Sequence, residues 1–339
     1  MLTALLKEAT MRKEYLQNEL VETIYIGGGT PSLLDTAEID LLVGHLLKTF
    51  HVAEDAEITL EANPDDIVPQ KLAAWKQTGI NRLSLGIQSF FEEDLAWMNR
   101  AHDAAQARNA VELAIQQFPN ITIDLIYGTP GLSDEKWKRN VETATGFGIP
   151  HLSCYALTVE PKTPLHKMIA NKRAEDTDPA RQASQFLLLM DWLAQEGYEH
   201  YEISNFAKPG FRSRHNSAYW QGKDYLGLGP SAHSFNGTSR QWNISNNNIY
   251  IDSVSKGILS FEKEILTESQ QANENIMISL RTMEGLNLEH LKNGVRESVE
   301  KAAKTYLESG HLSRHHNFLR LTREGKLLAD GIAAALFIE

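Results

Sequence analysis

Five short β-rich runs recur in the first half of this chain of 339 residues, and amphipathic helix patterns separate them. The runs read TIYIGGG, ITLEANP, LSLGIQSF, ITIDLIYGTP and LSCYALTVEP, and their first apolar residues lie near positions 24, 58, 83, 121 and 152. The intervals of 25 to 38 residues leave room for one helix between consecutive runs. This alternation is typical of βαβ units, and apolar strands without strict alternation favour a parallel sheet covered by helices.

Two of the intervening segments carry specific helix signals. Apolar residues at helical spacing follow the first run: Ile39, Leu42, Val43 and Leu46. Asp103 is followed three residues later by Gln106, which is a capping-box pattern for the start of another helix.

Polar or glycine residues come where four of the runs end. Gly27 to Gly29 follow IYI, Glu61 follows ITL, Gln88 follows SLGI and Asp124 follows ITI. Each of these residues, taken alone, is compatible with a turn residue or a helix cap. The glycines of GGGTP have neither the spacing of a phosphate loop nor that of a dinucleotide fingerprint. Ligands bind at the carboxyl ends of parallel strands, so the agreement of four runs indicates a ligand site there.

Composition excludes several classes of partner. Lys and Arg number 33 against 44 Asp and Glu, and the net charge of −11 disfavours nucleic acid and anionic membrane surfaces. No apolar signal core or run of about 20 apolar residues occurs, so a soluble, cytoplasmic protein is predicted. The single cysteine, Cys154, is too few for an intrachain disulfide or an all-cysteine metal site.

The pattern changes after residue 170. Asp178-Pro179 begins a helix, and a long stretch rich in Gly, Pro and Asn follows, which is expected to be irregular and functional. From Leu266 the order of helix, hairpin and last helix resembles a winged helix. The predicted domains are residues 1–170, 171–265 and 266–339.

The motifs GGGTP, E-x-N-P, LGIQSF, DLIYGTP and CYALTVEPKTPL, in this order, resemble those of the radical S-adenosylmethionine (SAM) family. The resemblance covers essentially the whole chain. It is to the branch that contains the oxygen-independent coproporphyrinogen III oxidases and the heme chaperone HemW. It implies an α/β fold with a partial (β/α)6-type barrel of parallel strands, its first strand missing, and a C-terminal, mainly helical, winged-helix-like module.

The same resemblance implies a SAM site and an iron–sulfur cluster. The residues that match the family's SAM-binding motifs are Gly28, Gly29, Thr30, Glu61, Gln88, Arg100, Asp124 and Ala156. The family's 4Fe-4S cluster needs a C-x-x-x-C-x-x-C motif, which this sequence lacks. We therefore expect that this chain as given does not cleave SAM reductively. Both a fragment of a longer protein and a true cluster-less paralogue remain open.

The stretch RHNSAYW, residues 214–220, matches the H-N-x-x-Y-W motif associated with heme binding in HemW-like proteins. The resemblance implies His215 as a ligand of heme iron from a mobile loop, with Asn216, Tyr219 and Trp220 beside it. Arg212 and Arg214 are candidate partners of the heme propionates. The alternative is that the motif forms a polar turn whose aromatic residues pack in the core.

Three functions follow from the resemblance. The first is a heme-binding chaperone that transfers heme to acceptor proteins, including membrane-bound ones reached by peripheral contact. The second is an oxygen-independent coproporphyrinogen III oxidase, which decarboxylates its substrate oxidatively and needs the absent cysteines. The third is a non-catalytic barrel remnant that binds nothing tightly.

Overall fold

A computed structural model describes all residues from Met1 to Glu339. The chain forms two compact units. The terminal unit contains Met1–Ile24, Leu34–Glu57 and Arg214–Glu339, and the central unit contains Tyr25–Leu33 and Ile58–Ser213. These units are defined by spatial contacts, and the three domain boundaries expected from the sequence stay a prediction.

One sheet has the strand order β1-β2-β3-β4-β5-β7-β6. Its strands are β1 (Val21–Ile26), β2 (Val52–Ala62), β3 (Arg82–Gln88), β4 (Ile121–Tyr127), β5 (His151–Ala156), β6 (Glu199–Glu202) and β7 (Asn205–Ala207). From β2 to β5, neighbouring strands pair in parallel. The five expected strands are thus confirmed in chain order, and together they make the curled, half-barrel sheet of the α/β fold.

The far edge of this sheet is a feature that the sequence analysis missed. Strand β7 pairs antiparallel with both β5 and β6, so a short hairpin extends the parallel strands. It lies inside the stretch expected to be irregular. Strands of four and three residues are too short to give a clear periodic signal.

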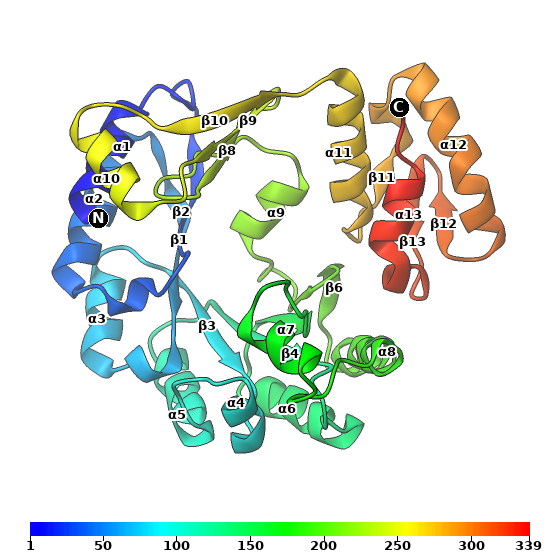
Figure 1. Cartoon of the computed structure of the whole chain (residues 1–339), viewed down its shortest axis with the longest axis horizontal. Coiled ribbons are helices and arrows are strands. Elements are labelled where there is room, and N and C mark those ends of the chain that lie inside the picture. Colours follow the sequence, from blue (N-terminus) through cyan, green and yellow to red (C-terminus); the bar gives the residue numbers. More distant parts are fainter. The chain divides into compact units, whose positions relative to one another are not determined.

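Helices of the central unit surround the strands in Figure 1. They are α3 (Pro69–Gln77), α4 (Glu92–Trp97), α5 (Ala104–Ile115), α6 (Asp134–Gly146), α7 (Pro164–Ala170) and α8 (Pro179–Gln195), with 3-10 turns η1 (Pro31–Leu33) and η2 (Pro64–Asp66). The capping box of Asp103 and Gln106 is confirmed at the start of α5. Asp178 caps α8 as predicted, because its side chain accepts the N–H groups of Ala180 and Arg181.

The terminal unit begins with α1 (Leu2–Met11) and contains α2 (Thr36–Thr49), whose four predicted apolar residues are buried. Its remaining elements before the C-terminal module are α9 (Arg214–Trp220), β8 (His233–Phe235), β9 (Ser239–Asn243), α10 (Asn247–Ser255) and β10 (Phe261–Ile265). Strands β10, β9 and β8 form a three-stranded antiparallel sheet. No helix in the chain is both long enough and apolar enough to cross a membrane.

The C-terminal module has the expected order of helices and hairpin. It comprises α11 (Glu268–Leu280), β11 (Leu286–Asn287), η3 (Leu288–His290), α12 (Asn293–Glu308), β12 (Leu312–His315), β13 (Phe318–Leu321), η4 (Gly325–Leu328) and α13 (Ala329–Ala335). Strands β11, β13 and β12 form one small sheet, and β12 and β13 are the predicted hairpin. The winged-helix-like arrangement follows from this order.

A buried ion pair anchors α1 within the terminal unit. Glu8 and Arg12 are 1% and 4% exposed, and Arg12 Nε lies 3.1 Å from Glu8 Oε1. Glu8 also accepts hydrogen bonds from the Gly229 N–H and the Tyr250 hydroxyl, at 2.8 and 2.6 Å. Arg12 donates to Asn243 Oδ1 at 2.9 Å. Because both charges are paired and hydrogen-bonded, removing one would leave the other buried and uncompensated.

We therefore expect Arg12→Met to lower the free energy of unfolding by about 3–5 kcal/mol, as measured by urea titration. The matched control is Lys13→Met, because the Lys13 side chain is 60% exposed. A surface change of this kind costs less than about 0.5 kcal/mol. Equal losses in the two variants would contradict the role of the buried pair.

Candidate functional site

Glycine is required at the three positions after β1 for two different structural reasons. A Cβ on Gly27 would lie 2.7 Å from Glu61 Cδ, so Gly27 lets that side chain approach the backbone. Gly28 and Gly29 have φ values of +77° and +123°, which side chains disfavour. Glu61 Oε2 accepts the Gly28 N–H at 3.1 Å, and Oε1 accepts the Tyr25 hydroxyl at 2.7 Å. Glu61 therefore fixes the glycine loop at the end of β1.

Gln88 and Arg100 meet next to Gly86 in β3. A Cβ on Gly86 would lie 2.9 Å from Gln88 Nε2 and 3.5 Å from an Arg100 guanidinium nitrogen. Gln88 Oε1 and Arg100 Nε are both buried without a hydrogen-bond partner. An unpaired buried polar group costs about 1–3 kcal/mol, and buried polar atoms are rarely left unpaired in proteins. Two such atoms from neighbouring side chains are suited to a polar ligand.

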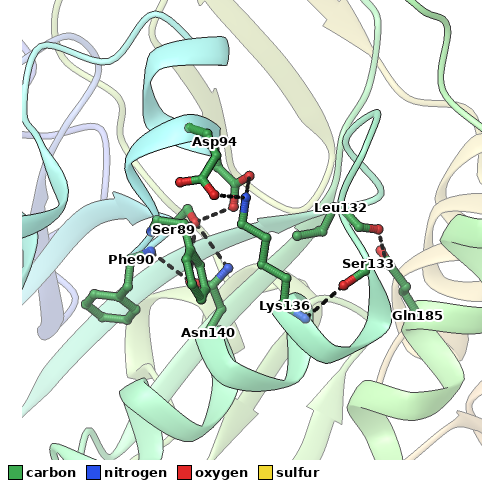
Figure 2. Close-up of polar contacts among 10 residues, drawn as sticks. Ser89, Phe90, Asp94, Leu132, Ser133, Lys136, Asn140 and Gln185 are labelled. Carbon is green, nitrogen blue, oxygen red and sulfur yellow. Dashed lines mark hydrogen bonds and ion pairs between the residues drawn. The ribbon is translucent and has the colours of Figure 1, made fainter.

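The loop after Gln88 is held firmly in place. Figure 2 shows Asn140 of α6 accepting the Phe90 N–H at 2.7 Å and donating to Ser89 Oγ at 3.1 Å. Ser89 Oγ donates to Asp94 at 2.7 Å, and Lys136 forms an ion pair with Asp94 at 2.7 Å. This network supports the φ of +61° at Gln88, a conformation that is uncommon for a residue with a side chain.

Asp124 is a half-buried carboxyl at the centre of β4. Burial is the main cause, and the nearby negative charge of Glu61 a second one, that together raise the pKa of Asp124 to about 7. A hydrogen bond with Ser153 and the positive charge of Arg100 act in the opposite direction. The charges of Glu61 and Arg100 thus both affect the pKa of Asp124, so the three side chains interact electrostatically within the central unit.

The structure brings together most, but not all, of the residues expected to bind SAM. Gly28 and Glu61 are hydrogen-bonded, and Gln88 and Arg100 are neighbours. Gly29 and Thr30 belong to the same loop as Gly28, and the Thr30 carbonyl accepts the Leu33 N–H of η1. Ala156 ends β5 opposite Tyr127 and forms no hydrogen bond with these side chains.

The heme motif forms a helical turn, whereas a loop was expected from the sequence. Residues 214–220 are helix α9. The carboxylate of Glu57 in β2 accepts the backbone N–H groups of Arg214 and His215, at 3.1 and 2.9 Å. These two N–H groups have no partner inside the helix, so an acceptor on a distant strand stabilises its first turn.

The helical spacing sorts the motif residues into two pairs. His215 and Tyr219 lie one turn apart, and their ring centroids are 5.1 Å from each other. The ring of Tyr219 also contacts that of Tyr225, with a centroid distance of 4.6 Å. Asn216 and Trp220 share the neighbouring face. Trp220 packs under the Arg281 guanidinium at 5.1 Å, and its ring N–H is buried without a hydrogen-bond acceptor.

The two arginines expected to bind propionates already pair with protein carboxylates. Arg212 Nε lies 3.0 Å from Glu199 Oε2. Arg214 pairs with Asp55 at 3.3 Å and donates to its backbone carbonyl at 2.7 Å. A propionate bound by either arginine would share the guanidinium with one of these protein carboxylates, because arginine has five N–H donors.

Comparison with known proteins establishes the class first. Residues 5–144 match the model of the radical SAM superfamily, and residues 266–328 match that of the HemN C-terminal domain. The solved structure of coproporphyrinogen III oxidase (HemN) from Escherichia coli, a radical SAM enzyme, superposes with a TM-score of 0.84. The match covers 99% of this chain and 82% of that chain at 24% identity, so it shows the fold alone. The architecture is that of a radical SAM protein with a HemN-type C-terminal domain.

More similar sequences identify the family within this class. The heme chaperone HemW of Mycobacterium tuberculosis strain H37Rv is 36% identical over 339 residues, which cover 99% of this chain and 85% of that protein. HemW of Bacillus subtilis strain 168 is 31% identical over 326 residues, which cover 94% and 86%. The chain belongs to the HemW family.

Membership of the radical SAM superfamily implies SAM and a 4Fe-4S cluster as the cofactors of the family. The strand-end residues of the central unit fit SAM, because two buried polar atoms there lack partners and the glycine loop is open beside Gly28 and Gly29. The cluster has no matching donor set. Cys154 in β5 is 1% exposed, and burial raises the pKa of its thiol. No group of three or more His, Cys, Asp or Glu side chains is arranged so that it could hold a metal ion.

Several residues in these contacts were missed from the sequence. They are Thr23, Tyr25, Glu57, Asn63 and Ser153. Alternation along a strand is the signal that finds Thr23, Tyr25 and Glu57, because side chains two or four residues apart share one face. Tyr25 lies two residues before Gly27, and Glu57 lies four residues before Glu61.

The raised pKa of Asp124 predicts a pH-dependent stability. The unfolded chain releases this proton near pH 4, whereas the folded chain holds it to about pH 7, so stability falls as the pH rises between these values. Asn cannot titrate. We expect Asp124→Asn to raise the melting temperature relative to wild type by more at pH 8 than at pH 5, as measured by calorimetry.

The control for this prediction is Asp176→Asn, because Asp176 is exposed. Its effect on the melting temperature should not depend on pH over this range. A difference between Asp124→Asn and wild type that is the same at both pH values would contradict the raised pKa.

Proposed function

We propose that this chain binds heme at helix α9 and transfers it to heme-accepting proteins. The observation that carries the proposal is the anchoring of His215. Its backbone is held by Glu57 and its ring Nδ1 lies 2.9 Å from Thr23 Oγ1, in a chain whose relatives are named heme chaperones.

The residues around His215 suit a flat, apolar ligand. An imidazole nitrogen is a common ligand of heme iron. Tyr219 is 40% exposed beside His215 and offers an aromatic face, whereas one face of Trp220 is already covered by Arg281. An exposed aromatic side chain next to a histidine favours a cargo that enters and leaves, since a fully enclosed heme would be held too firmly for transfer.

We also propose that the strand-end residues of the central unit bind SAM. Glu61 would hold the glycine loop in place. Asp124 is suited to accept the ribose hydroxyls, and Arg100 to pair with the ligand carboxylate. What SAM supplies in this superfamily is radical chemistry at an iron–sulfur cluster, and the residues of this chain would serve to bind and orient SAM.

The function of a coproporphyrinogen III oxidase has no specific support in this chain. The likeness to the Escherichia coli enzyme is one of fold, at 24% identity. The reaction requires a cluster, for which this chain offers a single, buried thiol. Cytoplasmic location and contact with membrane-bound acceptors stay predictions of the sequence resemblance.

Heme titration tests the first proposal. We expect the wild-type chain to give a saturable Soret shift, and His215→Ala to reduce heme affinity by at least about tenfold, because an iron ligand worth more than about 1.4 kcal/mol is lost. The matched control is His316→Ala, since His316 lies exposed in the turn between β12 and β13. Equal affinities of the two alanine variants would refute the assignment of heme to α9.

Equilibrium dialysis with labelled SAM tests the second proposal. We expect Glu61→Gln to weaken SAM binding about tenfold or more, because a charge-assisted hydrogen bond that fixes the glycine loop becomes a weaker one. Glu54→Gln is the control, an exposed glutamate on the same strand. Absence of SAM binding by the wild type, or unchanged binding by Glu61→Gln, would overturn the proposed SAM site.

A further inference from the structure

His215 is fixed at two points by residues of β1 and β2, all within the terminal unit. Its ring Nδ1 lies 2.9 Å from Thr23 Oγ1. Its backbone N–H donates to Glu57 Oε1 at 2.9 Å, and Glu57 is only 5% exposed. A hydrogen bond to a charged acceptor away from bulk water is a strong one, so Glu57 holds the start of α9 in place. The ring is held by a neutral hydrogen bond with the Thr23 hydroxyl.

A third contact restricts rotation of the His215 ring. Tyr219 meets it nearly edge-on, with an angle of 86° between the ring planes. Tyr219 is supported in turn by Tyr225, which packs against Phe235 at 6.1 Å. The position, tilt and one hydrogen bond of the imidazole are therefore all set before any ligand arrives.

We propose that Thr23 and Glu57 are positioning residues that present His215 to heme iron through Nε2. This inference rests on the heme-binding function proposed above. Glu57 sets where the helix begins, and the Thr23 hydroxyl oxygen accepts a hydrogen bond from the Nδ1–H group of the His215 ring.

The chemical reason lies in the two tautomers of imidazole. A neutral ring carries its proton on one nitrogen and a lone pair on the other. Metal-binding histidines usually donate the remaining N–H to a nearby oxygen, which fixes the tautomer and the ring orientation. If Thr23 Oγ1 accepts from Nδ1, the lone pair lies on Nε2, which is the state that an iron ligand requires.

The opposite direction of this hydrogen bond would give the opposite state. If the Thr23 hydroxyl donated to Nδ1, the proton would lie on Nε2 and the ring would need to exchange it before binding iron. The distance alone fits both directions, so the tautomer is the quantity that tests the inference.

The test uses the heme-free full chain labelled with ¹⁵N-histidine. Long-range ¹H–¹⁵N spectra at pH 8 report the tautomer of each ring, and His215→Ala identifies the signal of His215. We expect the wild type to show the Nδ1–H tautomer, Thr23→Val to show a mixture or the Nε2–H tautomer, and Thr23→Ser to resemble the wild type. An Nε2–H tautomer in the wild type, or no change in Thr23→Val, would overturn the role of Thr23.

A second arm measures heme affinity in the same variants and in Glu57→Gln. Loss of a residue that orients a metal ligand typically weakens binding 10- to 100-fold, so we expect about this loss in Thr23→Val and Glu57→Gln and recovery in Thr23→Ser. Thermal unfolding of each variant at pH 8 identifies a general loss of structure. A folded Glu57→Gln with wild-type heme affinity would remove Glu57 from the proposal.

The two arms separate this inference from the function on which it rests. If the wild type binds no heme, the heme-binding function fails, whereas the tautomer is still measured in the heme-free chain. The other outcome is that heme binding depends on His215 while Thr23→Val and Thr23→Ser show the same His215 tautomer and the same heme affinity. In that case the heme-binding function is supported and the positioning role of Thr23 is refuted.

Discussion

Glutamate carboxylates that accept backbone N–H groups fix the critical segments of this chain. Glu8 accepts the N–H of Gly229, Glu57 accepts those of Arg214 and His215, and Glu61 accepts that of Gly28. A buried carboxylate is costly unless its oxygens are hydrogen-bonded, so each one strongly favours the backbone conformation that satisfies it. These bonds therefore help to fix the start of α9 and the glycine loop.

The helices and parallel strands were predictable because their signals are local. Four apolar residues at helical spacing identified α2, and the pair Asp103 and Gln106 identified the start of α5. Each signal lies within one turn or one strand of the element that it predicts. The five β-rich runs were recognised for the same reason, and their parallel pairing followed from the helices between them.

The features that were missed depend on partners far along the chain. Helix α9 was expected to be a loop because the acceptor of its first N–H groups, Glu57, lies 157 and 158 residues away. Glu61 and Gln88 lie at the ends of β2 and β3 as predicted, whereas Asp124 lies in the middle of β4 and not at its end. Tyr25, whose hydroxyl donates to Glu61, was missed. The glycines were expected to serve a ligand or a turn, and the sequence did not show that Gly27 makes room for the side chains of Glu61 and Tyr25.

The two candidate sites require different residues of this chain. The heme site at α9 needs an imidazole, its supporting hydrogen bonds and aromatic faces, all of which the terminal unit supplies. The SAM site needs the polar strand ends of the central unit, which are present, and radical chemistry needs a cluster for which Cys154 alone offers a thiol. The proposed heme site therefore uses only residues that are present in this chain.

Electron paramagnetic resonance of the ferric heme complex tests most directly whether His215 holds the iron. The chain would be purified without an iron–sulfur cluster and labelled with ¹⁵N only at histidine. We expect hyperfine coupling from one histidine nitrogen in the wild type, and its loss in His215→Ala. The same histidine coupling in both proteins would contradict the assignment of heme to α9.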